Sequence, residues 1–233
     1  MRKRNLFLLP IIMVCTILTA APAMASHQQT SQLNSATQVV KEIMQIPETS
    51  IPPALLANAQ GIVVVPRVIK AGFVVGGEYG KGVMSVRESD GTWSAPVFVT
   101  LMGGSLGYQI GAEATDFVIV FKNRRGIDGI TQGKFTLGAD ASVAAGPVGR
   151  NASASTDVKL DAEVYSYSRS KGLFAGISLE GASLRIDQAS DTDFYGKQGH
   201  RPSDILAGNH LKVPAAAEEF RKTLDRYASV TRK

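Results

Sequence analysis

The chain has 233 residues, 44% of them hydrophobic and 19% charged, which is long enough to bury one sizeable core. It carries 25 Lys and Arg against 20 Asp and Glu, but three of the basic residues lie within the first four positions. Without those three the balance is 22 to 20, a net charge of +2. Nucleic-acid binding therefore loses its main support, and any attraction to an anionic surface must come from local basic patches.

Residues 1–25 predict a secretory signal peptide. A basic start is followed by the apolar run Leu6–Ala20 and by Ala23-Met24-Ala25, a small-residue cleavage pattern. The alternative is a membrane-anchoring helix, which the shortness of the run and its interruption by Pro10 disfavour. We therefore expect an exported protein, periplasmic or secreted, with peripheral attachment to a membrane as one option.

The single cysteine, Cys15, lies inside this apolar run and follows the bulky Val14, which does not fit a lipoprotein anchor. The mature chain is then expected to have no thiol nucleophile, no disulfide and no cysteine metal site.

Residues 26–48 predict an N-terminal amphipathic helix. Between Ser31 and Ile46 an apolar stripe recurs at helical spacing, formed by Leu33, Ala36, Val40, Ile43 and Met44. Two destinations stay open for the stripe: docking on a sheet, which we expect, or lying in a membrane interface. On the polar face Lys41 is balanced by Glu42, so electrostatics would contribute little to the second.

Residues 49–200 predict a β-rich domain. This region holds 22 of the 23 glycines, and only two of the ten prolines, Pro96 and Pro147, lie between Arg67 and Arg201, which favours a continuous sheet with tight turns. Short helices are expected at Ala54–Ala59 and Arg125–Gln132, and Asp90-Gly91 predicts a hairpin. The predicted strands are Gly61–Val68, Gly82–Val86, Trp93–Leu101, Phe117–Phe121, Phe135–Ala145, Ala152–Tyr167 and Leu173–Ile186.

Residues 201–233 predict a C-terminal helical extension, with a capped turn at Ser203–Leu206 and a helix opened by Pro214 that runs through Tyr227. The expected fold class is α+β. It is a single β-rich domain, either a twisted antiparallel sheet or a partly closed barrel, with flanking N- and C-terminal helices.

No constellation predicts catalysis, a cofactor or a metal. The three histidines, His27, His200 and His210, lack ligand spacing. Ser105 lies in a Gly-Ser-x-Gly pattern that lacks the first spacer of a nucleophile elbow, so a glycine-lined bend is the better interpretation. The glycine-rich segment Gly76–Gly82, interpreted as a loop, lacks the Gly-Lys-Ser/Thr ending of a phosphate loop. We therefore expect a non-enzymatic protein.

Four segments in order carry a resemblance to a known family: Ala71–Gly77, Trp93–Pro96, the small-residue run Gly138–Arg150, and Ser166–Gly176. From about Ile51 to Gly196 the chain resembles the SYLF domain of bacteria and eukaryotes. The resemblance implies a phospholipid-binding module, often one that prefers phosphoinositides. Some eukaryotic members also bind actin and carry an SH3 or FYVE domain, but actin binding is not expected of an exported protein.

The expected partner is an anionic phospholipid or membrane surface, because a headgroup site needs Lys or Arg for phosphate and apolar side chains to enter the interface. The candidate lipid-binding residues are Arg150, Arg169, Lys171, Phe174 and Lys70. A second basic cluster, Lys122 with Arg124 and Arg125, is the next candidate. The alternative function is a structural or protein-interaction role in the periplasm without a specific lipid ligand.

Overall fold

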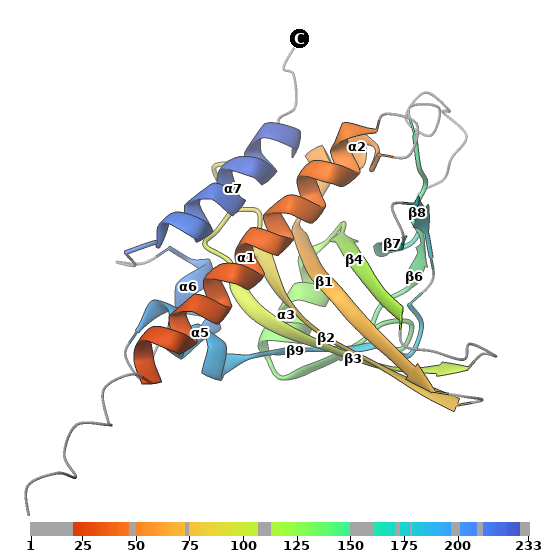
Figure 1. The fold of residues 1–233 in the computed structure, drawn as a ribbon. Coiled ribbons are helices and arrows are strands. Elements are labelled where there is room, and N and C mark those ends of the chain that lie inside the picture. Colours follow the sequence, from red (N-terminus) through yellow and green to blue (C-terminus); the bar gives the residue numbers. More distant parts are fainter. Residues whose placement is uncertain are drawn as a thin grey trace, which may run out of the picture.

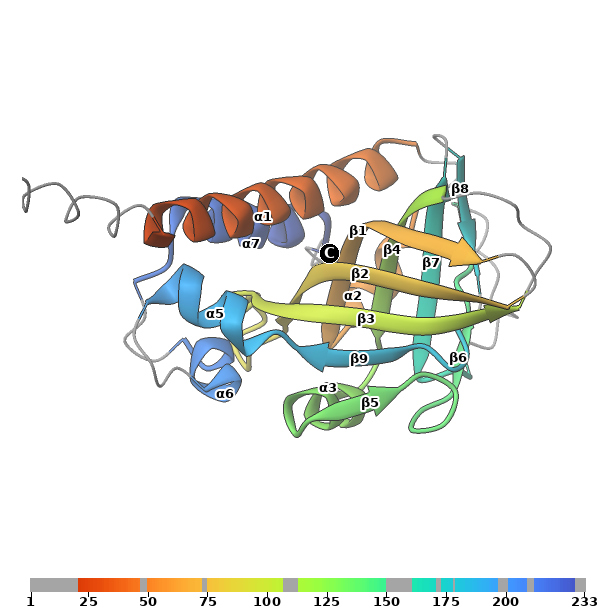
Figure 2. The same ribbon diagram turned by 60° about the horizontal axis from the view of Figure 1, so that its bottom comes forward.

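A computed structural model describes residues 21–46, 50–72, 75–106, 113–149, 161–170, 173–177, 179–196, 201–208 and 212–228. In this part of the chain, nine strands form one curled, mixed sheet with helices packed on both of its faces (Figures 1 and 2). The neighbour order is β5-β9-β3-β2-β1-β4-β7-β6, and β8 also pairs with β7. The strands are β1 (Gly61–Gly72), β2 (Val75–Val86), β3 (Val97–Leu106), β4 (Glu113–Phe121), β5 (Lys134–Thr136), β6 (Val143–Ala145), β7 (Val164–Ser170), β8 (Leu173–Gly176) and β9 (Ser183–Ile186).

Six helices accompany the sheet in the described ranges, and they include the predicted N- and C-terminal ones. The α+β class with a curled sheet is therefore confirmed. The helices are α1 (Ala21–Gln45), α2 (Pro53–Asn58), α3 (Arg124–Thr131), α5 (Gln188–Tyr195), α6 (Pro202–Leu206) and α7 (Ala215–Ala228).

Strand β1 lies at the centre of the sheet and pairs antiparallel with both β2 and β4. Its valine run is buried on both faces. Ile62 and Val64 face one core, beneath α1, α2 and α7. Val63 and Val65 face a second core inside the curl, which includes residues of α3.

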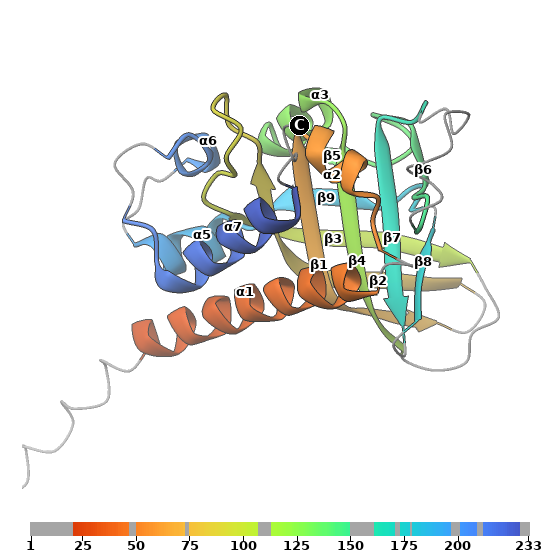
Figure 3. The same ribbon diagram turned by 90° about the horizontal axis from the view of Figure 1, so that it is seen from above.

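Helix α1 docks on the outer face of the sheet, side by side with α7 (Figures 1 and 3). The predicted stripe is buried at Leu33, Ala36, Val40 and Ile43, and Met44 packs against the same core. The expected docking is therefore confirmed, although the helix begins at Ala21, ten residues before the predicted start at Ser31.

The glycine-rich segment Gly76–Gly82 was misread as a loop, because it forms part of the long strand β2. The glycines serve close packing: a Cβ on Gly82 would lie 2.3 Å from the Val64 carbonyl oxygen, and one on Gly80 would lie 2.6 Å from a Val68 methyl. The bend expected at Ser105 is also wrong, since that residue lies within β3.

Further differences concern four of the predicted strands and one helix. The predicted strand Phe135–Ala145 is two short strands, β5 and β6, separated by a turn, and Leu173–Ile186 is split into β8 and β9 around Gly181, whose φ is +82°. Trp93 forms only an isolated bridge to Arg87. Ala152–Tyr167 begins too early: residues 161–163 precede β7, and 152–160 lie outside the described residues. Helix α5 was not predicted, since its apolar pattern is weak.

The docking of α1 predicts that its apolar stripe stabilises the whole domain. Leu33→Ala is expected to lower the free energy of unfolding by about 2–5 kcal/mol, because Leu33 is fully buried. The exposed Gln45 is the matched control, and Gln45→Ala should stay within about 0.5 kcal/mol of the parent. Chemical denaturation measures both. Deletion of residues 26–48 is expected to give an aggregating product, and a folded, soluble product would contradict the assignment of α1 to the core.

Candidate functional site

Strand β1 is interrupted in its middle by a bulge at Pro66 and Arg67. The register against β2 shifts between Val64 and Ile69, and the register against β4 shifts between Val65 and Val68. Proline has no N–H to donate to a ladder, so a bulge is where a sheet tolerates it. Arg67 adopts a φ of +51° and is the one non-glycine residue with positive φ in the described ranges. Such a conformation is unfavourable for a side chain with a Cβ and often marks a functional site.

A polar groove runs between this bulge and helix α1, and we call it the Arg67 groove. It consists of two adjoining hollows of about 600 and 530 Å³, which share Ser31, Ser35, Pro66 and Arg67 in their walls. Each lies within the size range of small-molecule sites. Hydroxyl and amide side chains of α1 form one wall, including Ser31, Asn34 and Gln38, and His27 lines the edge.

A buried carboxylate supports the bulge from below. Asp116 of β4 accepts the backbone N–H of Arg67 at 2.8 Å. The same side chain accepts two bonds from Arg169 of β7, at 2.9 Å from Nε and 2.6 Å from Nη2. Arg169 Nη1 is also ion-paired with Glu42 of α1. Two carboxylates thus compensate the charge of Arg169, and the network joins the bulge to the helix.

Burial perturbs both members of this pair. It raises the pKa of the Asp116 carboxyl, a rise that the backbone amide and the charge of Arg67 oppose, and it lowers the pKa of the Arg169 guanidinium.

The sequence-predicted site residues are only partly brought together. Arg169 lines the Arg67 groove, and it lies opposite Phe174 in the β7–β8 ladder. Phe174 stacks on Tyr167, with ring centroids 5.2 Å apart, so its side chain packs against the core. Lys70 lies elsewhere, in an ion pair of 3.1 Å with Glu78 and 5.1 Å from the centroid of the Phe117 ring. Arg150 and Lys171 lie outside the described residues.

Sequence reasoning missed Arg67. Its guanidinium is exposed and forms no hydrogen bond or ion pair with the described residues. A signal was present, because Pro66 interrupts a valine run and a proline inside a strand pattern predicts a bulge.

Two large apolar side chains are exposed beside Arg67. Ile69 and Tyr79 lie directly opposite each other on β1 and β2, with 54% and 48% of their surfaces exposed, and both line the same hollow as Arg67. An exposed cation next to exposed apolar side chains is the arrangement that a shallow membrane contact uses.

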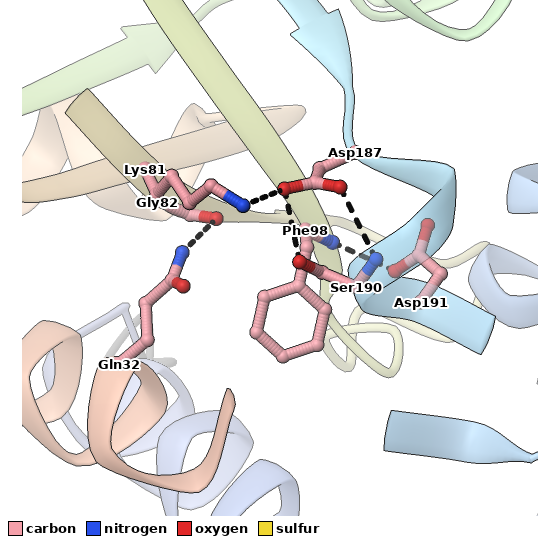
Figure 4. A network of polar contacts seen from close by, with 7 residues as sticks. All are labelled: Gln32, Lys81, Gly82, Phe98, Asp187, Ser190 and Asp191. Atoms are coloured by element: carbon pink, nitrogen blue, oxygen red, sulfur yellow. Dashed lines mark hydrogen bonds and ion pairs between the residues drawn. The ribbon is translucent and has the colours of Figure 1, made fainter. Parts of the chain in front are cut away.

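The far end of the groove is closed by a second polar network, shown in Figure 4. Gln32 of α1 donates to the Gly82 carbonyl at 2.8 Å, and Lys81 pairs with Asp187 at 2.7 Å. Asp187 is also the N-cap of α5, where it accepts the Ser190 N–H. The hydrogen bond to Asp187 raises the pKa of Lys81, so this lysine stays protonated, and the Asp187 carboxylate balances its charge.

One turn further along α5, Asp191 is fully buried and accepts the Phe98 N–H at 2.8 Å (Figure 4). Its other oxygen, Oδ2, has no hydrogen-bond partner among the described residues. Burial, reinforced by the charge of Asp187, raises the pKa of Asp191 to about 7. The described residues contain no cluster of His, Cys, Asp and Glu side chains suited to a metal ion.

Comparison with known proteins identifies relatives of this chain. Residues 102–227 match the family model of Ysc84, described as "Las17-binding protein actin regulator". SH3 domain-containing YSC84-like protein 1 of Xenopus laevis is 38% identical over 203 residues, which cover 84% of this chain and 60% of that protein. The human protein of the same name is 36% identical over 203 residues, covering 84% and 58%. Protein YSC84 of Saccharomyces cerevisiae is 35% identical over 209 residues, covering 88% and 42%. The chain thus spans between 42% and 60% of the length of these relatives.

The backbone of Arg67 predicts a gain in stability on substitution by glycine. Arg67→Gly should raise the free energy of unfolding by about 1 kcal/mol, because glycine adopts positive φ without steric cost. Chemical denaturation measures the change. Arg185, an exposed arginine of β9, is the matched control, and Arg185→Gly should lower stability because glycine weakens a strand. A destabilised Arg67→Gly protein would contradict the strain at this position.

Asp191 predicts a pH-dependent stability. Its carboxyl has a pKa of about 7 in the folded protein and about 3.9 in the unfolded chain, so between these values the folded state binds more protons. Stability from this group is therefore full below about pH 4, falls as the pH rises towards 7, and is level above that, a change of up to about 4 kcal/mol. Asp191→Asn should remove this slope. Denaturation of both proteins from acid to neutral pH measures the difference, and identical profiles would contradict the assignment.

Proposed function

Because this chain belongs to the Ysc84 family, also described as the SYLF family, we propose that it is a non-enzymatic module that binds anionic phospholipid at a membrane surface. The relatives are named as regulators or as SH3 domain-containing proteins. One observation carries the lipid proposal: the exposed guanidinium of Arg67 lies beside the exposed Ile69 and Tyr79.

In this proposal Arg67 contacts the phosphate group, and Ile69 and Tyr79 supply the apolar contact with the membrane. The Arg67 guanidinium attracts a phosphate and can bond it through two N–H groups. Ile69 and Tyr79 present exposed apolar surface. Transfer of this surface from water into the membrane interface lowers the free energy of the system. Tyrosine is well suited to that boundary because its ring is apolar and its hydroxyl is polar. Among the described residues, no helix is both long and apolar enough to cross a bilayer, so the proposal is for peripheral contact.

The basic residues predicted from the sequence, Arg169 and Lys70, are less available than Arg67 to bind a lipid phosphate. Arg169 is held by Asp116 and Glu42, and Lys70 is held by Glu78, so a lipid phosphate would have to displace a carboxylate from either. These two residues, with Phe174, Arg150 and Lys171, stay predictions as headgroup contacts. Export to the periplasm or the medium likewise stays a prediction.

A protein-interaction role is the second candidate, because the matched family model is described as an actin regulator that binds Las17. That description belongs to the family's named members, and this chain spans at most 60% of the compared relatives. A stoichiometric protein partner captured in the absence of lipid would favour this role over the first.

Liposome flotation tests the lipid proposal. The protein is expected to float with vesicles that contain phosphatidylglycerol and to stay behind with vesicles of phosphatidylcholine alone, with binding that weakens as salt screens the charges. The double variant Ile69→Ser, Tyr79→Ser should lose flotation, since it removes the apolar contact without disturbing a buried residue.

Leu173 supplies a matched control, because it is 79% exposed but belongs to the β7–β8 hairpin beside Arg169 and Phe174. Leu173→Ser should float like the parent. If Leu173→Ser alone loses binding, the contact lies at the sequence-predicted site. If the parent does not float with any anionic vesicle at low salt, the lipid proposal is wrong.

A further inference from the structure

Three cations around the Arg67 groove, Arg67, Arg169 and Lys81, are accompanied by three carboxylates, Asp116, Glu42 and Asp187. Arg169 is matched by Asp116 and Glu42, and Lys81 at the other end is matched by Asp187. Arg67 differs from the other described arginines and lysines that line the groove, since its guanidinium forms no hydrogen bond or close ion pair with a described carboxylate, although its charge acts on Asp116. The groove therefore offers a ligand one guanidinium whose N–H groups are not bonded to a described carboxylate, which is enough to bond one phosphate group through two N–H groups.

The position of this charge is set by the backbone. Asp116 accepts the Arg67 N–H, and Arg169 in turn holds Asp116 with two bonds. The strained φ of +51° is thus supported by a buried network rather than by the strand ladder, which shifts register at this point. A conformation that is unfavourable by itself and supported from several sides is expected where it presents a side chain to a ligand.

The wall of the groove formed by α1 carries polar, uncharged side chains, and these determine which uncharged groups of a ligand can bind there. Helix α1 presents the hydroxyl groups of Ser31 and Ser35 and the amide of Asn34 to the same space. Such side chains both donate and accept hydrogen bonds, and they match hydroxyl groups rather than acyl chains or ammonium groups. Further apolar surface is supplied at the outer end by Ile69 and Tyr79.

We infer that the Arg67 groove is a binding site for one phosphodiester group that carries a hydroxylated substituent of the glycerol type. Arg67 bonds the phosphodiester oxygens, Ser31 and Asn34 bond the hydroxyl groups, and Asp116 and Arg169 are positioning residues that do not touch the ligand. The phosphodiester can belong to a lipid headgroup or to a free small molecule. The lipid source rests on the proposed function, whereas the site itself does not.

The first test uses a soluble probe, glycerophosphoglycerol, and measures its affinity by titration calorimetry. Arg67→Gln should weaken binding about tenfold or more, because it removes a charge-assisted, two-bond contact. Arg67→Lys, which keeps the charge but loses the planar fork, should weaken it less. Arg185→Gln, the exposed control on β9, should bind like the parent. Thermal unfolding of each variant verifies that it is folded.

A second probe tests the charge of the ligand. Inositol trisphosphate carries several phosphate groups and should bind no more tightly than glycerophosphoglycerol, since one guanidinium with unoccupied N–H groups is available and its carboxylate neighbours disfavour additional negative charge. A preference of tenfold or more for inositol trisphosphate would overturn the assignment to a single phosphodiester.

The third arm uses vesicles of phosphatidylcholine with and without phosphatidylglycerol, and it separates this inference from the proposed function. Soluble binding that depends on Arg67, without vesicle binding, supports the site and overturns the membrane function. Vesicle binding that depends on Arg67, without soluble binding, supports the site with a lipid as its source. If Arg67→Gln binds vesicles like the parent, or no probe binds at all, the site is wrong.

Discussion

The Asp116 carboxylate receives an N–H that the sheet itself cannot use, because the ladders on both sides of β1 shift register around Pro66 and Arg67. A buried N–H without an acceptor would destabilise the central strand by about 1–3 kcal/mol. Asp116 is itself buried and would be costly if it were charged and isolated, but Arg169 bonds it twice. The bulge, the acceptor and the cation therefore depend on one another, and the Arg67 groove exists because all three are present.

Helix α1 connects this local arrangement to the stability of the domain. Its apolar stripe covers one of the two cores, and its Glu42 forms an ion pair with Arg169 of β7. Along the same helix, Gln32 bonds the Gly82 carbonyl, and Lys41 pairs with Glu219 of α7. Between these anchors, the helix presents mainly polar side chains to the groove, namely Asn34, Ser35 and Gln38. The apolar face of α1 thus covers the core, and its polar face forms one wall of the Arg67 groove.

The two aspartates at the start of α5, Asp187 and Asp191, differ in how burial affects their pKa values. Lys81 and Asp187 compensate each other, and the bonds that Asp187 accepts from Lys81 and Ser190 keep its pKa below the usual value although burial opposes this. Asp191, one turn along the same helix, has a single backbone donor and no cation, so burial dominates and its pKa rises. The two aspartates are four residues apart, yet the side chains around them place their titrations on opposite sides of the ordinary value.

Several features follow from the sequence alone, because they depend on composition and spacing over short distances. The valine run of β1, the apolar stripe of α1, the Asp90-Gly91 turn and the ordered segments of the SYLF resemblance are all of this kind. Pro66 inside the valine run is also a sequence signal for a bulge, but no bulge was predicted there. What only the tertiary structure decided is which charges are compensated. Arg169 meets Asp116 and Glu42 from 53 and 127 positions away, and Lys81 meets Asp187 from 106 positions away. A basic residue in the sequence carries the same charge wherever it lies, but its availability to a ligand depends on the carboxylates that folding brings to it.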